Sequence, residues 1–255
     1  MSMDLFGAAV IALAGVVCGF INTLAGSGSL LSLPVLMYFG GMDIRMANGT
    51  NRIGILLQSA VSAGSFHKQK VLNTRQGITL ALPSLAGSIL GAVWAVDLNK
   101  EVLERVIGVI FIVMLFVILL KPERWLKGKD DVVSAKPGFW QMLTMFAIGV
   151  YGGFIQAGTG IFLLAGLVLS AGYDLVRANA IKVLIVFLYT PFALYVFIYN
   201  GQVEFVTGLT LAAGNMVGAW IASRMAVQKG NKFIRWILIA VVVLSAGKFL
   251  GLYQW

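Results

Sequence analysis

Two short polar segments interrupt apolar sequence, and their residue types suit the binding of a small anion. The segments read Gly26-Ser27-Gly28 and Gly158-Thr159-Gly160. Because glycine and serine are poor helix formers, each segment predicts a break between two helical pieces. A helix that begins at such a break presents free backbone N–H groups and the positive end of its dipole, and both favour a bound anion.

Other polar side chains near the two breaks are expected to complete this site. Asn22, Ser27, Ser29, Gln156 and Thr159 would donate hydrogen bonds, and Asn48, Thr50, Asn51 and Asn179 would form a polar vestibule. Arg52 and Lys182 lie one turn into apolar segments, where no acidic residue neutralises them. A bound anion would explain these buried charges, which cost about 2.5–3.5 kcal/mol at the bilayer centre. The alternative is that both side chains snorkel to the membrane interface.

The glycines also have a structural explanation, because small residues let membrane helices pack closely. We favour close packing for Gly87, Gly91 and Gly218, which lie inside uninterrupted apolar runs. We favour binding for the two breaks, because the same pattern of glycine and hydroxyl residues occurs twice.

The composition is that of a polytopic membrane protein, whose partner is the lipid bilayer. Of the 255 residues, 59% are hydrophobic and 11% are charged, and mean hydropathy is +0.91. A soluble domain has roughly a quarter of its residues charged. The formal net charge of +9 is then explained by basic cytoplasmic loops, and no nucleic acid partner is expected.

Apolar runs predict an all-α protein with ten membrane segments, eight of them long and two short. The first five are residues 3–24, 29–40, 47–66, 78–96 and 102–120, and the second five are 139–157, 160–171, 178–199, 204–226 and 233–252. A full span needs about 20 residues, so 29–40 and 160–171 are half-length pieces that start at the breaks. The predicted parts are a first membrane repeat at 1–120, a cytoplasmic linker at 121–138 and a second repeat at 139–255.

The two halves also match in sequence, which predicts a five-plus-five inverted repeat with broken helices at its interface. Asp43, Ala47 and Asn48 align with Asp174, Ala178 and Asn179 after a one-residue gap. An odd number of segments in each half reverses the orientation of the second half. Placing the basic regions 67–77, 121–138 and 224–235, together with Arg177, in the cytoplasm leaves both termini in the periplasm.

The residues from Gly19 to Pro34, followed by Ala47-Asn48-Gly49-Thr50-Asn51, resemble the sulfite exporter TauE/SafE family of membrane transporters. The resemblance covers essentially the whole chain. It implies alternating-access transport of a small sulfur-containing anion, such as sulfite, a sulfonate or thiosulfate, across the bacterial inner membrane. Ser29 stands where many relatives have a further glycine, and this departure would narrow or reshape the pocket.

Two other functions fit parts of the sequence. An intramembrane serine hydrolase could use Ser27, but it would need a histidine base within reach, and His67 is the only histidine. An anion channel would use the same polar breaks without a coupling ion, and no coupling site is visible in the sequence. The sequence predicts no cofactor and no metal site, and exposed faces of small residues would permit a homodimer.

Overall fold

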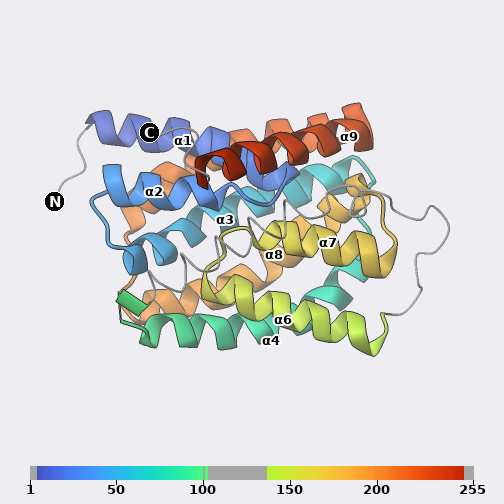
Figure 1. The fold of residues 1–255 in the computed structure, drawn as a ribbon, viewed down its shortest axis with the longest axis horizontal. Helices are drawn as coiled ribbons and strands as arrows, with labels where there is room; N and C mark the ends of the chain where they lie inside the picture. Colours follow the sequence, from blue (N-terminus) through green and yellow to red (C-terminus); the bar gives the residue numbers. More distant parts are fainter. Residues whose placement is uncertain (1–4, 100, 103–136, 250–255) are drawn as a thin grey trace.

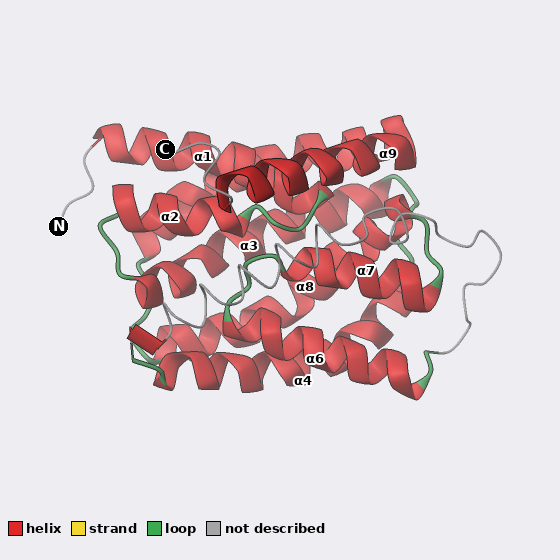
Figure 2. Cartoon of the chain, in the orientation of Figure 1, coloured by secondary structure: helices red, strands yellow, loops and turns green. Residues whose placement is uncertain are grey.

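The structure, a computed structural model, describes residues 5–99, 101–102 and 137–249, with the backbone alone at 170–171 and 239–249. All regular secondary structure in these ranges is helical (Figure 2). The helices are α1 (Leu5–Leu24), α2 (Ser29–Phe39), α3 (Ile44–Lys68), α4 (Thr74–Asp97), α6 (Phe139–Phe154), α7 (Thr159–Ala171), α8 (Leu175–Tyr199) and α9 (Phe205–Phe249). The stretches long and apolar enough to cross a membrane are Leu5–Leu24, Thr74–Asp97, Leu175–Tyr199 and Phe205–Leu238.

The described helices follow the predicted segments closely, although the count of ten is not tested. The predicted segment 102–120 lies almost entirely outside the described residues, as does most of the linker 121–138. Helix α9 runs through the predicted segment 204–226 and into 233–252, with non-helical backbone at Gly230 (φ 67°, ψ −165°) between them. All-helical membrane architecture is therefore confirmed for the part of the chain that the structure describes.

The two short helices begin at the glycine breaks, as the sequence predicts. Helix α2 has 11 residues and α7 has 13, so each is shorter than a full membrane span. The backbone between the helical pieces enters the left-handed region at Gly26 (φ +80°) and Gly158 (φ +74°). Glycine adopts this conformation without the steric cost that a Cβ would add, and this is why the breaks occur here.

Equivalent aspartates start the helices that follow the two short pieces. The Asp43 carboxylate accepts a hydrogen bond from Met46 N at the start of α3. The Asp174 carboxylate accepts hydrogen bonds from Val176 N and Arg177 N at the start of α8. Such N-caps stabilise a helix by about 1 kcal/mol. The aligned Asp43 and Asp174 therefore have the same structural role in the two halves.

Helices from the two halves pack against each other in two similar pairs, α1 with α9 and α4 with α6 (Figure 1). A Cβ on Gly218 of α9 would lie 1.9 Å from the carbonyl oxygen of Val16 in α1. In the same way, a Cβ on Gly91 of α4 would lie 1.9 Å from the carbonyl oxygen of Val150 in α6. The close-packing explanation for these glycines is therefore confirmed.

The substitution Gly218→Ala is expected to lower stability by about 1–3 kcal/mol, since the new methyl group would force the α1 and α9 backbones apart. The matched control is Gly64→Ala in α3, where a Cβ would meet no atom within 4 Å. Alanine has a higher helix propensity than glycine, so the free energy of unfolding of Gly64→Ala should be unchanged or slightly raised. Thermal unfolding of the two purified variants in detergent measures the difference, and equal melting temperatures would show that α1 and α9 do not pack as described.

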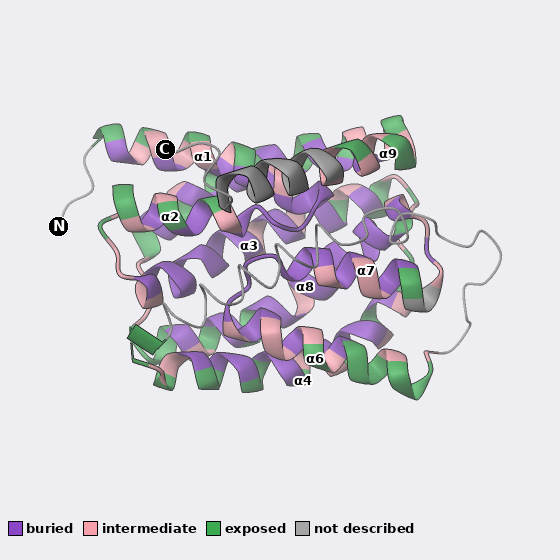
Figure 3. Ribbon diagram, viewed as in Figure 1, coloured by how far each residue is buried: buried purple, intermediate pink, exposed green. Residues whose placement is uncertain are grey.

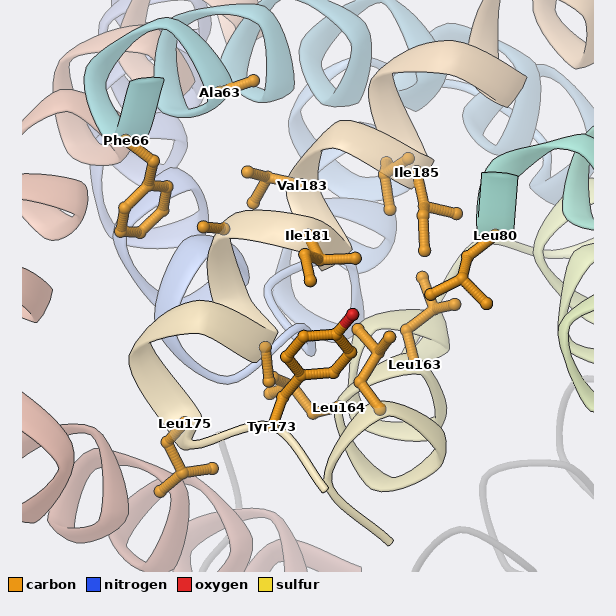
Figure 4. Packing of buried hydrophobic residues seen from close by; sticks show 14 of the residues in the cluster. Ala63, Phe66, Leu80, Leu163, Leu164, Tyr173, Leu175, Ile181, Val183 and Ile185 are labelled. Atoms are coloured by element: carbon orange, nitrogen blue, oxygen red, sulfur yellow. The ribbon is translucent and has the colours of Figure 1, made fainter. Parts of the chain in front are cut away.

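The core lies around α3 and α8, which the other helices surround, and burial is concentrated there (Figure 3). Figure 4 shows part of the largest apolar cluster in the described chain, with Ile181 of α8 toward Leu164 of α7 and Val183 of α8 toward Ala63 of α3. Large apolar side chains are exposed on the outer helices, among them Trp94, Trp140, Trp220 and Trp236. This distribution suits a protein whose outer surface contacts lipid.

Basic regions that are far apart in sequence lie at one end of the helix bundle. Lys70 and Arg177 line one cavity, and Lys68 and Arg224 line another. The amide of Val176 donates to Asn231 Oδ1 at 3.1 Å, which joins the start of α8 to α9 at this end. We name this the basic end of the molecule.

The opposite end is formed by other connections. The amide of Glu204, just before α9, donates to the hydroxyl of Thr50 at 2.9 Å. Partial burial by itself would raise the pKa of Glu204, but hydrogen bonds from Thr207 and Val206 outweigh it and hold the pKa below its usual value. Thr50 therefore contributes to the joint between α3 and the start of α9.

Candidate functional site

The two glycine breaks meet inside the protein. A Cβ built on Gly26 would lie 2.3 Å from the Cα atom of Gly160, and a Cβ built on Gly160 would lie 2.3 Å from the Cα atom of Gly26. No side chain fits between the two backbones, so this contact requires glycine at both positions. The starts of α2 and α7 are thereby brought close together, as the sequence predicts.

Lys182 of α8 binds the C-terminal end of α1. Its Nζ donates to the carbonyl oxygens of Asn22 and Thr23, at 3.0 and 2.8 Å, and to Asn179 Oδ1 at 2.6 Å. The last carbonyls of a helix have no partner within the helix and form the negative end of its dipole. A cation from the second half therefore caps the broken helix of the first half.

Arg52 of α3 makes the reciprocal contact with the end of α6. Its Nη1 donates to Gly152 O at 3.1 Å and to Gln156 Oε1 at 3.3 Å, and its Nη2 donates to Gly153 O at 2.5 Å. The guanidinium carbon also lies 4.3 Å from the centroid of the Phe197 ring. A cation from the first half therefore caps the broken helix of the second half.

Asn48 and Asn179 support these two caps in the same way. Asn48 Nδ2 donates to Phe154 O at 2.9 Å, and Asn179 Nδ2 donates to Leu24 O at 3.2 Å. These carbonyls belong to the last residues of α6 and α1. The aligned asparagines thus tie each long helix to the broken helix of the other half.

The alternative that the two cations snorkel to the interface is wrong. Arg52 is 0% exposed and Lys182 is 2% exposed. Their charges are stabilised by helix C-terminal carbonyls, a partner that the sequence analysis did not consider. A bound anion is therefore not needed to explain why these charges are buried.

A small cavity lies between the breaks, with a volume of about 20 Å³, which is room for about one water molecule. Its lining residues are Asn22, Gly26, Ile55, Gln58, Ser59, Gln156, Gly160, Lys182, Val183 and Val186. We name it the central cavity. Among the described residues, this lining includes Lys182 and no acidic residue, and Arg52 is not part of it.

The predicted site residues therefore fall into four groups. Asn22, Gly26, Gln156, Gly160 and Lys182 line the central cavity. Ser27, Gly28, Ser29, Gly158 and Thr159 form the two breaks and helix starts, while Asn48, Arg52 and Asn179 hold the helix ends. Thr50 lies at the joint with Glu204, and Asn51 accepts a hydrogen bond from Ser32 Oγ at 2.7 Å, outside the lining.

Several polar atoms at the breaks have no partner within the described residues. The hydroxyl oxygens of Ser27 and Ser29 are buried without a hydrogen bond in this part of the chain. The carboxamide oxygen of Asn22 is already engaged, because it accepts from Gly28 N at 2.8 Å. The two serine hydroxyls at the first break are therefore available to a ligand.

Sequence analysis missed three polar residues of the site, Gln58, Ser59 and Tyr189. Gln58 and Ser59 line the central cavity, and Gln58 Oε1 has no partner among the described residues. The Tyr189 hydroxyl accepts from Gln156 Nε2 at 3.0 Å. The available signal was a Gln-Ser pair inside the apolar segment 47–66, since polar residues at membrane depth mark contacts or sites.

The structure does not pair Ser27 with a histidine. His67 lies in the exposed last turn of α3, at the basic end, and Ser27 Oγ has no hydrogen-bond partner in the described part of the chain. A serine hydrolase needs its base within hydrogen-bond reach of the nucleophile. The described residues thus give the hydrolase alternative no catalytic pair.

Comparison with known proteins agrees with the membrane architecture. The family described as "Sulfite exporter TauE/SafE" matches residues 11–249. "Probable membrane transporter protein ORF9" of Sinorhizobium sp is 30% identical over 239 residues, which cover 93% of this chain and 90% of the relative. "Probable membrane transporter protein YfcA" of Escherichia coli (strain K12) is 29% identical over 234 residues, which cover 91% of this chain and 85% of the relative. No solved structure matches the chain significantly. The chain is a membrane transporter rather than an enzyme, and it belongs to the sulfite exporter TauE/SafE family.

Proposed function

We propose that the protein is a secondary transporter that moves a small anion, specifically a sulfur oxyanion or sulfonate, across the bacterial inner membrane. The observation that carries this proposal is Lys182, which is among the residues that line a cavity between two broken helices, and the described lining of that cavity contains no carboxylate. A cavity with a cation and unpaired hydroxyl groups nearby favours an anion over a cation or an apolar solute. The family description supplies the element sulfur.

The proposed mechanism is alternating access by two halves that form an inverted repeat, 1–120 and 139–255, joined by a cytoplasmic linker at 121–138. The matching helix pairs, α1 with α9 and α4 with α6, support this arrangement. The reciprocal caps by Arg52 and Lys182 support it as well. Broken helices that meet at the repeat interface are a common way to build a transporter site. In this arrangement the basic end faces the cytoplasm, and both termini lie in the periplasm.

The central cavity is small in this structure and must enlarge to hold the anion. Its volume of about 20 Å³ has room for about one water molecule, and an oxyanion with three or four oxygen atoms needs more space. Lys182 gives this enlargement a physical cause, since an anion would compete with Asn22 O and Thr23 O for the ammonium group. Binding of the anion would then loosen the contact between α8 and α1, and so link occupancy of the site to movement of the halves.

The test measures the thermal stability of the purified protein with sulfite, sulfate, thiosulfate, small sulfonates, acetate and chloride. A ligand that binds only the folded state adds RT ln(1 + [L]/Kd) to stability, about 2.7 kcal/mol at one hundred times Kd. We expect a selective shift with a sulfur anion that is lost in Gly160→Ala, where the new Cβ meets Gly26. The absence of a shift with every anion would overturn the proposed site.

Flux measurements distinguish a transporter from an anion channel. We expect uptake of the radiolabelled anion into proteoliposomes to saturate, and unlabelled anion on the far side to accelerate it by exchange. An alternating-access carrier shows this counterflow because the carrier with bound anion changes from one membrane side to the other faster than the empty carrier does. Flux that rises linearly with concentration and shows no counterflow would favour the channel.

A further inference from the structure

A second cavity, of about 640 Å³, opens at the basic end of the molecule. Its lining residues are Lys70, Val71, Leu72, Asn73, Thr74, Gln76, Tyr173, Arg177 and Ile181. They come from the connection between α3 and α4 and the start of α4 in the first half, and from the connection between α7 and α8 and the first turns of α8 in the second half. The cavity therefore lies between the halves, as the central cavity does, and it is large enough for a hydrated small anion.

The charge of this second cavity is positive. Lys70 and Arg177 line it, and its lining contains no carboxylate. The nearest acid in sequence, Asp174, forms an ion pair with Arg177, since its Oδ2 lies 3.4 Å from Arg177 Nε, and its Oδ1 accepts from two backbone amides. Asp174 offsets part of the charge of Arg177, so Lys70 supplies the net positive charge of this wall. The N-terminal end of α4, capped by Asn73, adds the positive end of a 24-residue helix to the same wall.

The second cavity also lies close to the central cavity along α8. Ile181 lines the second cavity, and the next two residues, Lys182 and Val183, line the central one. Ile181 belongs to the apolar cluster of Figure 4, in which the Tyr173 ring lies beside Leu164 and near Ile181. Tyr173 also donates from its hydroxyl to Gln76 Oε1 at 2.7 Å, and burial raises the pKa of this hydroxyl, so it keeps its proton. The two linings therefore meet at consecutive residues of α8.

We propose that the second cavity is an anion vestibule at the cytoplasmic face, where Lys70 and Arg177 concentrate a small oxyanion or sulfonate next to the central cavity. This inference rests on the proposed function and adds to it a separate site on one side of the membrane. Each cation within about 8 Å changes the local concentration of a monovalent anion about twofold in water. With Arg177 offset by Asp174, the net charge of about one cation would then give an enrichment of about twofold, and more for a divalent anion.

The test uses Thr74→Cys as a reporter inside the vestibule. Cys18 is 1% exposed and is replaced by alanine to leave one thiol. In membrane vesicles that expose the basic end, we measure how fast the introduced thiol reacts with a small sulfonated maleimide, which is an anion, and with neutral N-ethylmaleimide. The ratio of the first rate to the second reports the preference of the vestibule for an anion. We expect this ratio to fall about threefold or more when Lys70→Gln and Arg177→Gln are added. We also expect sulfate to slow the sulfonated reagent, at ionic strength held constant with sodium gluconate.

The matched control removes two other cations, Arg224→Gln and Lys229→Gln, which lie on α9 and do not line the vestibule. Their loss should change the ratio by less than the loss of Lys70 and Arg177. If Thr74→Cys does not fold, Leu72→Cys reports from the same lining. Equal effects of the two double variants, or no slowing by sulfate, would overturn the vestibule.

Failure of the vestibule and failure of the proposed function give different results. An unchanged labelling ratio, with a selective thermal shift by a sulfur anion, would remove the vestibule and leave the central site intact. A labelling ratio that depends on Lys70 and Arg177, without any thermal shift or saturable flux, would instead overturn the proposed transport of sulfur anions.

Discussion

Lys182→Gln is expected to abolish the selective thermal shift and to weaken sulfur-anion binding roughly 10- to 100-fold. The reason is that Lys182 is the only cation among the residues that line the central cavity, and a hydrogen bond to a charged group contributes about 1.5–3 kcal/mol. Isothermal calorimetry on the purified variant, with the anion that shifts the wild type, measures the loss. The control is Lys229→Gln, an exposed lysine whose Nζ lies 5.0 Å from the Phe233 ring centroid.

The variant Lys182→Arg shows whether a loss of anion binding in Lys182→Gln comes from the lost positive charge or from a folding defect. It keeps a cation that can donate to Asn22 O and Thr23 O, so the protein should fold and retain part of its anion affinity. A well-folded Lys182→Gln protein that binds the anion as tightly as the wild type does would contradict the proposed role of this lysine.

Arg52→Gln is expected to lower stability far more than it lowers anion affinity. Arg52 donates to Gly152 O and Gly153 O, is fully buried and does not line the central cavity. Loss of its charged hydrogen bonds should cost roughly 3 kcal/mol. For a chain of this size, that corresponds to a fall of about 6–12 °C in Tm, which differential scanning fluorimetry measures.

The control for Arg52 is Arg45→Gln. Arg45 lies 4.0 Å from Asp43 in an ion pair whose side chains are 39% and 37% exposed, and such surface pairs contribute about 0–1 kcal/mol. An Arg52→Gln protein with an unchanged Tm but no anion binding would reverse the roles assigned here. Arg52 would then contact the anion directly in another state of the transport cycle.

These two predictions differ because the halves are similar without being identical. Arg52 and Lys182 cap opposite broken helices, yet the sequence alignment pairs Lys182 with Asn51. Lys182 is among the residues that line the central cavity, and Arg52 is not. We therefore propose anion contact for Lys182 in addition to its contact with a helix end, and support of a helix end alone for Arg52.

Local sequence predicted the features that depend on backbone preference and hydropathy. Gly26 and Gly158 could be recognised as breaks because their left-handed φ angles favour glycine. Apolar length predicted where the helices run, because a membrane span needs a continuous apolar stretch. Asp43 and Asp174 matched in sequence because each caps the helix that follows it. All these signals lie within a few residues of the feature that they predict.

The tertiary structure decided which groups meet. Arg52 and Gly152 are 100 residues apart, and Lys182 and Asn22 are 160 apart, so no local pattern could show that these cations bind helix carbonyls. The same holds for Gln58 and Tyr189, which are polar positions of the site only because α3 and α8 bring them toward the breaks. Residue type and spacing determined that the membrane segments carry polar breaks and buried charges, and long-range packing determined which buried charge faces the cavity.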